Sequence, residues 1–297
     1  MRARPDILCI GSVLWDVIGR TPGAMAPGAD VPGTITRIPG GVAMNIAMTL
    51  RRQGLRPALL SAVGRDGPGE ALVAAAEAMG LDTAHLHRPA DLPTDSYMAI
   101  EDARGLIAAV ADAHSLEAAG AAILAPLADG RLGSLDAPWA GPVALDGNLT
   151  EDLLAEIATS PLFAAADLRV APASPGKATR LLALLTHPRA TLYVNRQEAG
   201  LLCATTFASA AEAAAALVGR GARHVLVTDG AGPVCAADAT GQITRTPPGV
   251  TQARVTGAGD TFMAAHIAAE RRGLAPAAAL EAALAAAAAY VAGKDDA

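Results

Sequence analysis

Short apolar runs alternate along the chain with longer segments whose apolar positions follow a helical spacing. The apolar runs lie at 7–13, 58–63, 143–146, 190–194 and 225–228, and helical patterns such as 44–53 and 69–79 separate most of them. Strands that are apolar throughout and joined by helices are typical of a parallel sheet covered by helices on both faces. The pattern therefore predicts an α/β fold with a ligand site at the carboxyl edge of the parallel strands.

Two stretches show a different pattern, of short alternating segments, at 34–38 and 96–110. Residues 102–105 divide the second stretch and have the composition of a hairpin turn. We expect these stretches to form a small accessory sheet. Because no repeat and no polar linker divides the 297 residues, one large domain over 1–297 with a small excursion is favoured over two independent domains.

Composition and charge exclude several classes of protein. The chain is 52% hydrophobic and 18% charged, so it can bury a large core and is not a disordered chain. Its formal net charge of -6 gives no basic surface for a nucleic-acid polymer or an anionic membrane. The alanine-rich stretch 264–291 carries charges and is divided by Gly273 and Pro276, which excludes a membrane span. The cysteines are far apart and odd in number, which favours a reducing, cytoplasmic location.

The segment that points most directly to chemistry is a run of small residues before an aspartate, at the start of a helical pattern. It reads Arg254-Val255-Thr256-Gly257-Ala258-Gly259-Asp260. Small residues let the backbone approach a ligand, and the first N–H groups of a helix lack internal acceptors and carry partial positive charge. Residues 257–259 are therefore expected to form a phosphate cradle. Asp260 is either a reactive carboxylate beside that cradle or only a helix-capping residue.

This segment and four others in the same order resemble the signature segments of the ribokinase-like (PfkB-type) sugar and nucleoside kinases. Each segment alone is a weak signal, whereas the ordered set is specific and spans nearly the whole chain. The others are the strand and aspartate at 10–16, the glycine pair and asparagine at 39–47, the G-x-D-x-x-G segment at 61–69 and the N-x-x-E motif at 195–198.

The resemblance implies a ribokinase-like three-layer αβα sandwich with a mostly parallel central sheet and a small β-sheet lid contributed by roughly 14–38 and 94–112. It also implies ATP as the phosphate donor, Mg²⁺, and a small-molecule nucleoside or sugar as the acceptor. Within the family, Val255-Thr256 before the glycines resembles the pseudouridine kinases, and short segments at 94–97, 146–149 and 174–177 agree with this. We therefore expect ATP-dependent phosphorylation of the 5′-hydroxyl of pseudouridine. The alternatives are a ribokinase or other sugar or nucleoside kinase and, from another class, a non-catalytic nucleoside- or sugar-binding protein.

The resemblance also implies roles for individual residues, each with a structural alternative. Asp260 would be the base that takes the proton of the hydroxyl, with Gly257, Ala258 and Gly259 as the anion hole. Asn195 and Glu198 would serve the Mg²⁺–phosphate network through water, or only form a capping box. The residues implied for ATP are Asn195, Thr228, Gly230 and Gly232. Those implied for the substrate are Ser12, Asp16, Gly40, Gly41, Asn45, Ser96, Asp112 and Lys177, with turns, caps and surface positions as the alternatives.

Some positions depart from the family pattern. Arg254 stands where relatives carry an acidic or amide residue near a monovalent-cation site, which argues against activation by K⁺. Ala171 replaces a common aspartate before proline, and Pro233 replaces the last glycine of the nucleotide loop at 228–233. A homodimer through the lid is a further expectation, because the family often dimerises in this way and a small exposed sheet has edges that can pair.

Overall fold

The computed structural model describes residues 4–251, 254 and 256–294, and its centre is a large, mostly parallel sheet. The strand order is β12-β11-β10-β9-β8-β7-β1-β4, and only β11 and β12, at one edge, run antiparallel to their neighbours. The strands of this sheet are β1 (Ile7–Ile10), β4 (Pro57–Leu60), β7 (Pro142–Asp146), β8 (Asp167–Ala171), β9 (Ala190–Asn195), β10 (His224–Thr228), β11 (Val234–Asp238) and β12 (Gly241–Arg245).

Helices cover both faces of the large sheet, and each helical layer closes its own buried apolar cluster. One layer contains α1 (Val42–Arg52), α2 (Gly67–Ala78), α8 (Ala258–Arg271) and α9 (Pro276–Val291). The other contains α3 (His114–Ala119), α4 (Ala125–Ala128), α5 (Glu151–Thr159), α6 (Arg196–Cys203) and α7 (Ala210–Gly219), with 3-10 turns η1 (Gly120–Leu124), η2 (Pro161–Phe163) and η3 (Pro175–Leu184). The αβα sandwich expected from the sequence is therefore confirmed.

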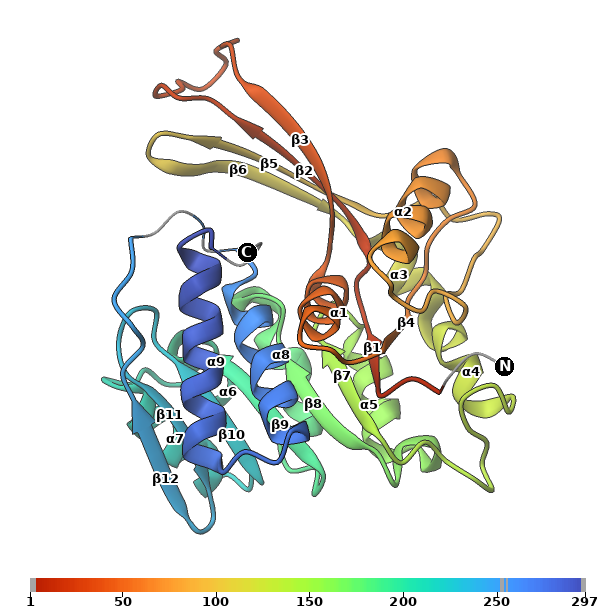
Figure 1. The fold of residues 1–297 in the computed structure, drawn as a ribbon, viewed down its shortest axis with the longest axis vertical. Coiled ribbons are helices and arrows are strands. Elements are labelled where there is room, and N and C mark those ends of the chain that lie inside the picture. Colours follow the sequence, from red (N-terminus) through yellow and green to blue (C-terminus); the bar gives the residue numbers. More distant parts are fainter. Residues whose placement is uncertain (1–3, 252–253, 255, 295–297) are drawn as a thin grey trace.

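A second sheet stands over one edge of the large sheet (Figure 1). Its order is β3-β2-β5-β6, and the expected turn at 102–105 joins β5 to β6. Gly105 adopts a φ of 116° there, a conformation that favours glycine. The strands are β2 (Leu14–Arg20), β3 (Thr34–Gly40), β5 (Ser96–Asp102) and β6 (Gly105–Asp112). We call this small sheet the lid.

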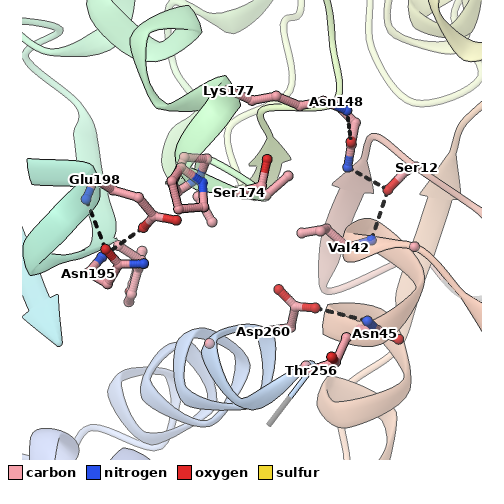
Figure 2. Close-up of a pocket in the computed structure, with 18 of the residues that line it drawn as sticks. Ser12, Val42, Asn45, Asn148, Ser174, Lys177, Asn195, Glu198, Thr256 and Asp260 are labelled. Atoms are coloured by element: carbon pink, nitrogen blue, oxygen red, sulfur yellow. Dashed lines mark hydrogen bonds between the residues drawn. The ribbon is translucent and has the colours of Figure 1, made fainter. Parts of the chain in front are cut away.

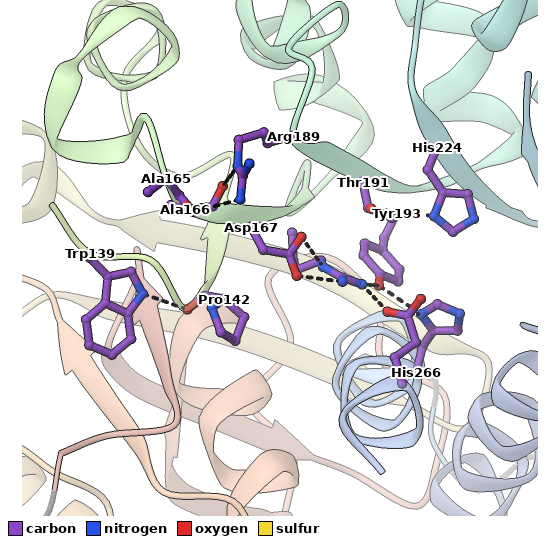
Figure 3. A network of polar contacts seen from close by, with 12 residues as sticks. Trp139, Pro142, Ala165, Ala166, Asp167, Arg189, Thr191, Tyr193, His224 and His266 are labelled. Atoms are coloured by element: carbon purple, nitrogen blue, oxygen red, sulfur yellow. Dashed lines mark hydrogen bonds and ion pairs between the residues drawn. The ribbon is translucent and has the colours of Figure 1, made fainter. Parts of the chain in front are cut away.

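The apolar pattern did not predict β8, because this strand alternates polar and apolar residues and carries an ion pair. Arg169, whose side chain is 13% exposed, donates to Asp167 Oδ2 at 2.6 Å and to the Tyr193 hydroxyl at 3.2 Å, and it pairs with Glu270 on α8. The Tyr193 hydroxyl lies 2.9 Å from His266 Nδ1, so the network joins β8 and β9 to α8 (Figure 3). Buried charge is tolerated in this sheet because each charged group has partners.

Candidate active site

A cavity of about 610 Å³ lies between the carboxyl edge of the large sheet, the lid and the first turns of α1 and α8. It collects side chains from segments far apart in the sequence, as the parallel topology predicts. The sequence-predicted residues that line it are Ser12, Asp16, Gly41, Asn45, Lys177, Asn195, Glu198, Thr228, Gly257, Gly259 and Asp260.

Gly257 begins α8 in a conformation that only glycine adopts easily. It is the N-cap with a φ of 89°, and a Cβ there would lie 2.5 Å from the Tyr290 hydroxyl. The helix follows at Ala258 and Gly259, whose N–H groups are among the first-turn donors that lack intrahelical acceptors. Gly257 and Gly259 line the cavity, whereas Ala258 does not. The start of α8 thus brings backbone donors and the positive end of the helix dipole to the cavity wall, as a phosphate cradle would need.

Asp260 lies in the first turn of α8, at the cavity wall, and its Oδ2 accepts a hydrogen bond from Asn45 Nδ2 at 2.9 Å. The pKa of Asp260 is raised to about 7, mainly by burial and also by the charges of Asp146, Asp16 and Glu198, whereas the hydrogen bond from Asn45 opposes the shift. A carboxylate that exchanges its proton near neutral pH is well suited to general-base chemistry.

Asp16 extends from the inner face of the lid, and burial raises its pKa to about 6. Gly40 does not line the cavity; a Cβ on it would overlap the Asp16 carboxylate. Gly41 is the N-cap of α1 with a φ of 93°, and a Cβ on it would overlap the carbonyl oxygen of Ser12. The glycine pair therefore brings the start of α1 close to both the lid and the end of β1.

The Ser12 hydroxyl lines the cavity, but its hydrogen-bonding capacity is filled by the protein. It accepts from the Val42 backbone N–H and from Asn148 Nδ2, both at 2.8 Å, and it donates to Asp146 Oδ2 at 3.2 Å. A hydroxyl has one donor and two acceptor positions, so none is left for a ligand. The sequence assigned Ser12 to substrate contact; in the structure its hydroxyl positions Asn148 and the start of α1.

Ser96 and Asp112 do not line this cavity, although both were assigned to the substrate. The two residues are paired in register on neighbouring strands, and so are Tyr97 and Ala111. Tyr97 and Ala111 line the cavity, so strand alternation places Ser96 and Asp112 on the opposite face of the lid. Asp112 instead contacts His114 Nδ1 at 2.8 Å. Alternation in the sequence revealed two faces but could not tell which one is turned inward.

Asn195 and Glu198 form a capping box at the start of α6. Asn195 Oδ1 accepts from the Glu198 N–H, and Glu198 Oε2 accepts from the Asn195 N–H, both at 2.8 Å. Both residues also line the cavity, so the capping role leaves a ligand role open. Burial raises the pKa of Glu198. Thr228 lies beside Asn195, because the ends of β10 and β9 are paired there.

The loop between β10 and β11 is a tight turn in which the Gly232 N–H donates to the Asp229 carbonyl at 2.8 Å. Gly230 has a φ of 58° in this turn, and Pro233 immediately precedes β11. Gly230 and Gly232 do not line the cavity described above. Of the residues assigned to ATP in this loop, only Thr228 lines the cavity.

Arg254 fastens the segment before the cradle to the end of α9. Its Nε donates to the Tyr290 carbonyl at 2.9 Å, and its guanidinium lies 3.8 Å from the centre of the Tyr290 ring. The Tyr290 hydroxyl in turn donates to the Thr256 carbonyl at 2.7 Å. Val255, part of the sequence resemblance, lies outside the described residues.

Comparison with known proteins agrees with this geometry. The family model of the pfkB family carbohydrate kinases matches residues 4–296. A pseudouridine kinase of Escherichia coli is 30% identical over 276 residues, which cover 89% of this chain and 83% of that protein. A solved carbohydrate kinase from Agrobacterium tumefaciens has a TM-score of 0.78 at 30% identity and covers 95% of this chain and 89% of its own. Arabidopsis thaliana ribokinase, solved with ribose and ATP, has a TM-score of 0.79 at 19% identity, with 97% and 93% covered.

Proposed function

The chain belongs to the pfkB family of carbohydrate kinases, and on this premise we propose that it uses ATP to phosphorylate the 5′-hydroxyl of a ribonucleoside, with pseudouridine preferred. The chain is thus a phosphotransferase with an alcohol group as acceptor. The observation that carries the proposal is Asp260, whose carboxyl group has a pKa of about 7 and lies beside the backbone cradle that begins α8.

Asp260 takes the proton of the substrate hydroxyl as that oxygen attacks the γ-phosphorus of ATP, and the bond to the β,γ-bridging oxygen breaks. The N–H groups at the start of α8 stabilise negative charge on the transferring phosphoryl oxygens. Asn45 holds the Asp260 carboxylate in place through its amide. Asp16, on the lid, is assigned to the ribose hydroxyls, and its place on the wall of the cavity that Asn45 and Asp260 also line supports this.

Glu198 is the carboxylate best placed for the Mg²⁺ that accompanies the nucleotide. Among the described residues, no group of three or more His, Cys, Asp or Glu could hold a metal ion. Magnesium commonly binds through one or two carboxylates, substrate phosphates and water, and a buried carboxylate at the cavity wall fits that pattern. When bound, the ion neutralises charge on the phosphate oxygens. Asn195, which is hydrogen-bonded to Glu198, and Thr228, which lies beside Asn195, are assigned to ATP.

The rate should depend on pH through Asp260. Because the base acts in its ionised form, we expect kcat/KM to rise with pH through an apparent pKa near 7. Asn45→Ala removes a bond that lowers this pKa, so the rise should move to higher pH; Asp16→Asn removes a negative charge that raises it, so the rise should move to lower pH. Initial rates from pH 5 to 9 test both shifts. A rise centred near pH 4 in the wild type would contradict the assignment.

Pseudouridine is proposed as the substrate because a pseudouridine kinase matches most of the chain. We expect kcat/KM for pseudouridine to exceed that for uridine and for ribose at least about 10-fold, which corresponds to roughly 1.4 kcal/mol in transition-state binding. A coupled ADP-release assay over pseudouridine, uridine, adenosine, ribose and fructose 6-phosphate measures this. A preference for ribose would favour the ribokinase alternative. Tight nucleoside binding without ADP release would favour the non-catalytic alternative.

We assign residues 1–297 to one kinase domain whose lid, at roughly 14–38 and 94–112, closes over the substrate. The cavity supports this assignment, since Asp16 and Tyr97 of the lid line it together with Asp260.

Activation by K⁺ is not expected, because the Arg254 guanidinium already places a cation beside the Tyr290 carbonyl. The proposed location is the cytoplasm, on the ground that Cys9, Cys203 and Cys235 are all free. Within the described residues, no helix has the length and apolar character of a membrane span.

A homodimer through the lid is supported by the apolar character of the lid face turned away from the cavity. Ile35, Met98 and Val110 lie on that face by strand register and are 78%, 53% and 69% exposed. We expect a dimer in sedimentation experiments and a shift to monomer for Val110→Lys. The control is Leu135→Lys, at an exposed leucine outside both sheets. A wild-type monomer at all concentrations would contradict the proposal.

A further inference from the structure

Across the cavity from Asp260, a chain of hydrogen bonds joins three polar side chains (Figure 2). Lys177 Nζ donates to Asn148 Oδ1 at 2.6 Å, and Asn148 Nδ2 donates to Ser12 Oγ at 2.8 Å. The three residues come from η3, from the turn after β7 and from the turn after β1. All of them line the cavity, and none takes part in the transfer step described above.

Asn148 is held firmly at its backbone. Its N–H donates to Asp146 Oδ1 at 2.7 Å, and Asp146 is 0% exposed. Arg180 donates to the Asn148 carbonyl at 3.3 Å and to the Leu149 carbonyl at 3.1 Å. Because an ammonium group only donates, the atom of the Asn148 amide that faces Lys177 must be the oxygen. The amide therefore presents its oxygen and its nitrogen in a defined order along the cavity wall.

The protein fills only part of the hydrogen-bonding capacity of Asn148 and Lys177. Asn148 retains one N–H of its amide nitrogen and one lone pair of its amide oxygen, and Lys177 retains further N–H donors. The order along the wall is thus donor (Asn148 Nδ2), acceptor (Asn148 Oδ1) and donor (Lys177 Nζ). The complement of this order is acceptor, donor and acceptor, which is the C=O, N–H and C=O of a cyclic imide.

We propose that Asn148 and Lys177 recognise the imide edge of a uracil-type base, with Ser12 as a positioning residue. This inference rests on the proposed function, since it assumes that the acceptor is a nucleoside. It identifies the class of base. Uridine and its carbon-linked isomer pseudouridine both present the imide, whereas cytosine and adenine replace a carbonyl or the ring N–H by groups of the opposite hydrogen-bonding type. The extra ring N–H of pseudouridine lies outside the imide, so these two residues read a feature that uridine shares.

Methylated substrates separate this inference from the substrate preference itself. N3-methylpseudouridine lacks the imide N–H, whereas N1-methylpseudouridine keeps the whole imide edge. For the wild type we expect kcat/KM to fall at least about 30-fold with the N3-methyl compound, because the remaining lone pair of Asn148 Oδ1 then receives no N–H and the methyl group collides with the oxygen. The N1-methyl compound should lose less than the N3-methyl compound.

Variants test whether Asn148 and Lys177 carry this selection. In Asn148→Ala and in Lys177→Met, kcat/KM for pseudouridine should fall at least about 10-fold, and in Asn148→Ala the penalty for N3-methylation should shrink to less than about 5-fold. A merely structural role would lower the rates for both compounds equally and keep the penalty. Lys294→Met removes an exposed ammonium outside the cavity and is the matched control. Melting temperatures identify a variant that fails to fold, in which case Asn148→Ser takes its place.

The outcomes distinguish the two levels of the proposal. Turnover of ribose but of no nucleoside overturns the proposed function. Turnover of pseudouridine with equal rates for the N1-methyl and N3-methyl compounds overturns only the role of Asn148 and Lys177. An N3-methylation penalty that persists unchanged in Asn148→Ala also overturns that role.

Discussion

The Asp260→Asn variant should lose at least about 10²-fold in kcat while its KM for ATP changes little. The amide keeps the shape of the side chain and can still accept the hydrogen bond from Asn45, but it cannot take up the proton of the substrate hydroxyl. Steady-state kinetics with pseudouridine and ATP measure the loss. A variant with near-normal kcat would show that Asp260 is only a first-turn residue of α8.

The same substitution should stabilise the fold at and above neutral pH. The pKa of Asp260 is raised from 3.8 to about 7 by burial, so the folded state disfavours the charged carboxylate. The contribution of such a group to the free energy of unfolding is largest when the pH is below the pKa of the group in the unfolded chain. This contribution is lost as the pH rises through the pKa of the group in the folded protein. Asparagine carries no such penalty, and we expect a gain of about 1–4 kcal/mol at pH 8 that disappears near pH 4. Thermal unfolding at both pH values tests this; an equal gain at both would contradict the cause.

The Arg169→Met variant should be the most destabilised of the substitutions considered. The Arg169 side chain is 13% exposed and is partnered by Asp167, Glu270 and Tyr193. Its removal takes a partner from the buried Tyr193 hydroxyl and from two carboxylates that are 36% and 31% exposed. Breaking a fully buried ion pair from one side costs about 3–5 kcal/mol. Because water partly solvates the two carboxylates left here, we expect a loss of about 1–3 kcal/mol. Denaturant unfolding of the whole chain measures the change in the free energy of unfolding.

Arg131→Met provides the control for this loss. Arg131 pairs with Asp129 through a similar set of short contacts, but both side chains are well exposed, at 48% and 42%. Exposed ion pairs contribute little because water and salt screen them, so no measurable change is expected. Equal losses at the two arginines would mean that the network between β8 and α8 does not act as a buried unit.

Local spacing in the sequence was sufficient for the layered architecture, for the hairpin at 102–105 and for the helix that starts after Gly257. These features depend on neighbouring residues, because apolar runs specify strands, turn residues specify hairpins, and small residues before a helical pattern specify its beginning. The sequence could also suggest the capping box at Asn195 and Glu198, because its two partners are only three positions apart.

Contacts between distant segments were decided only by the tertiary structure. A period of two showed that the lid has two faces, and only packing placed Tyr97 rather than Ser96 in the cavity. Ser12 looked like a free hydroxyl until Asp146 and Asn148, more than 130 positions away, were seen to fill its hydrogen-bonding capacity.

The charged residues Arg169 and Asp260 also depend on contacts between distant segments. The local sequence around β8 does not show that Arg169 is neutralised by Glu270, which lies 101 positions away, so the strand did not look like a buried one. The raised pKa of Asp260 is caused mainly by burial, which no local pattern records. The sequence by itself thus determined most of the elements and the start of α8 at Gly257, whose causes are local. The tertiary structure decided which polar groups line the cavity and how their pKa values shift, because hydrogen-bond saturation and desolvation depend on every neighbour in space.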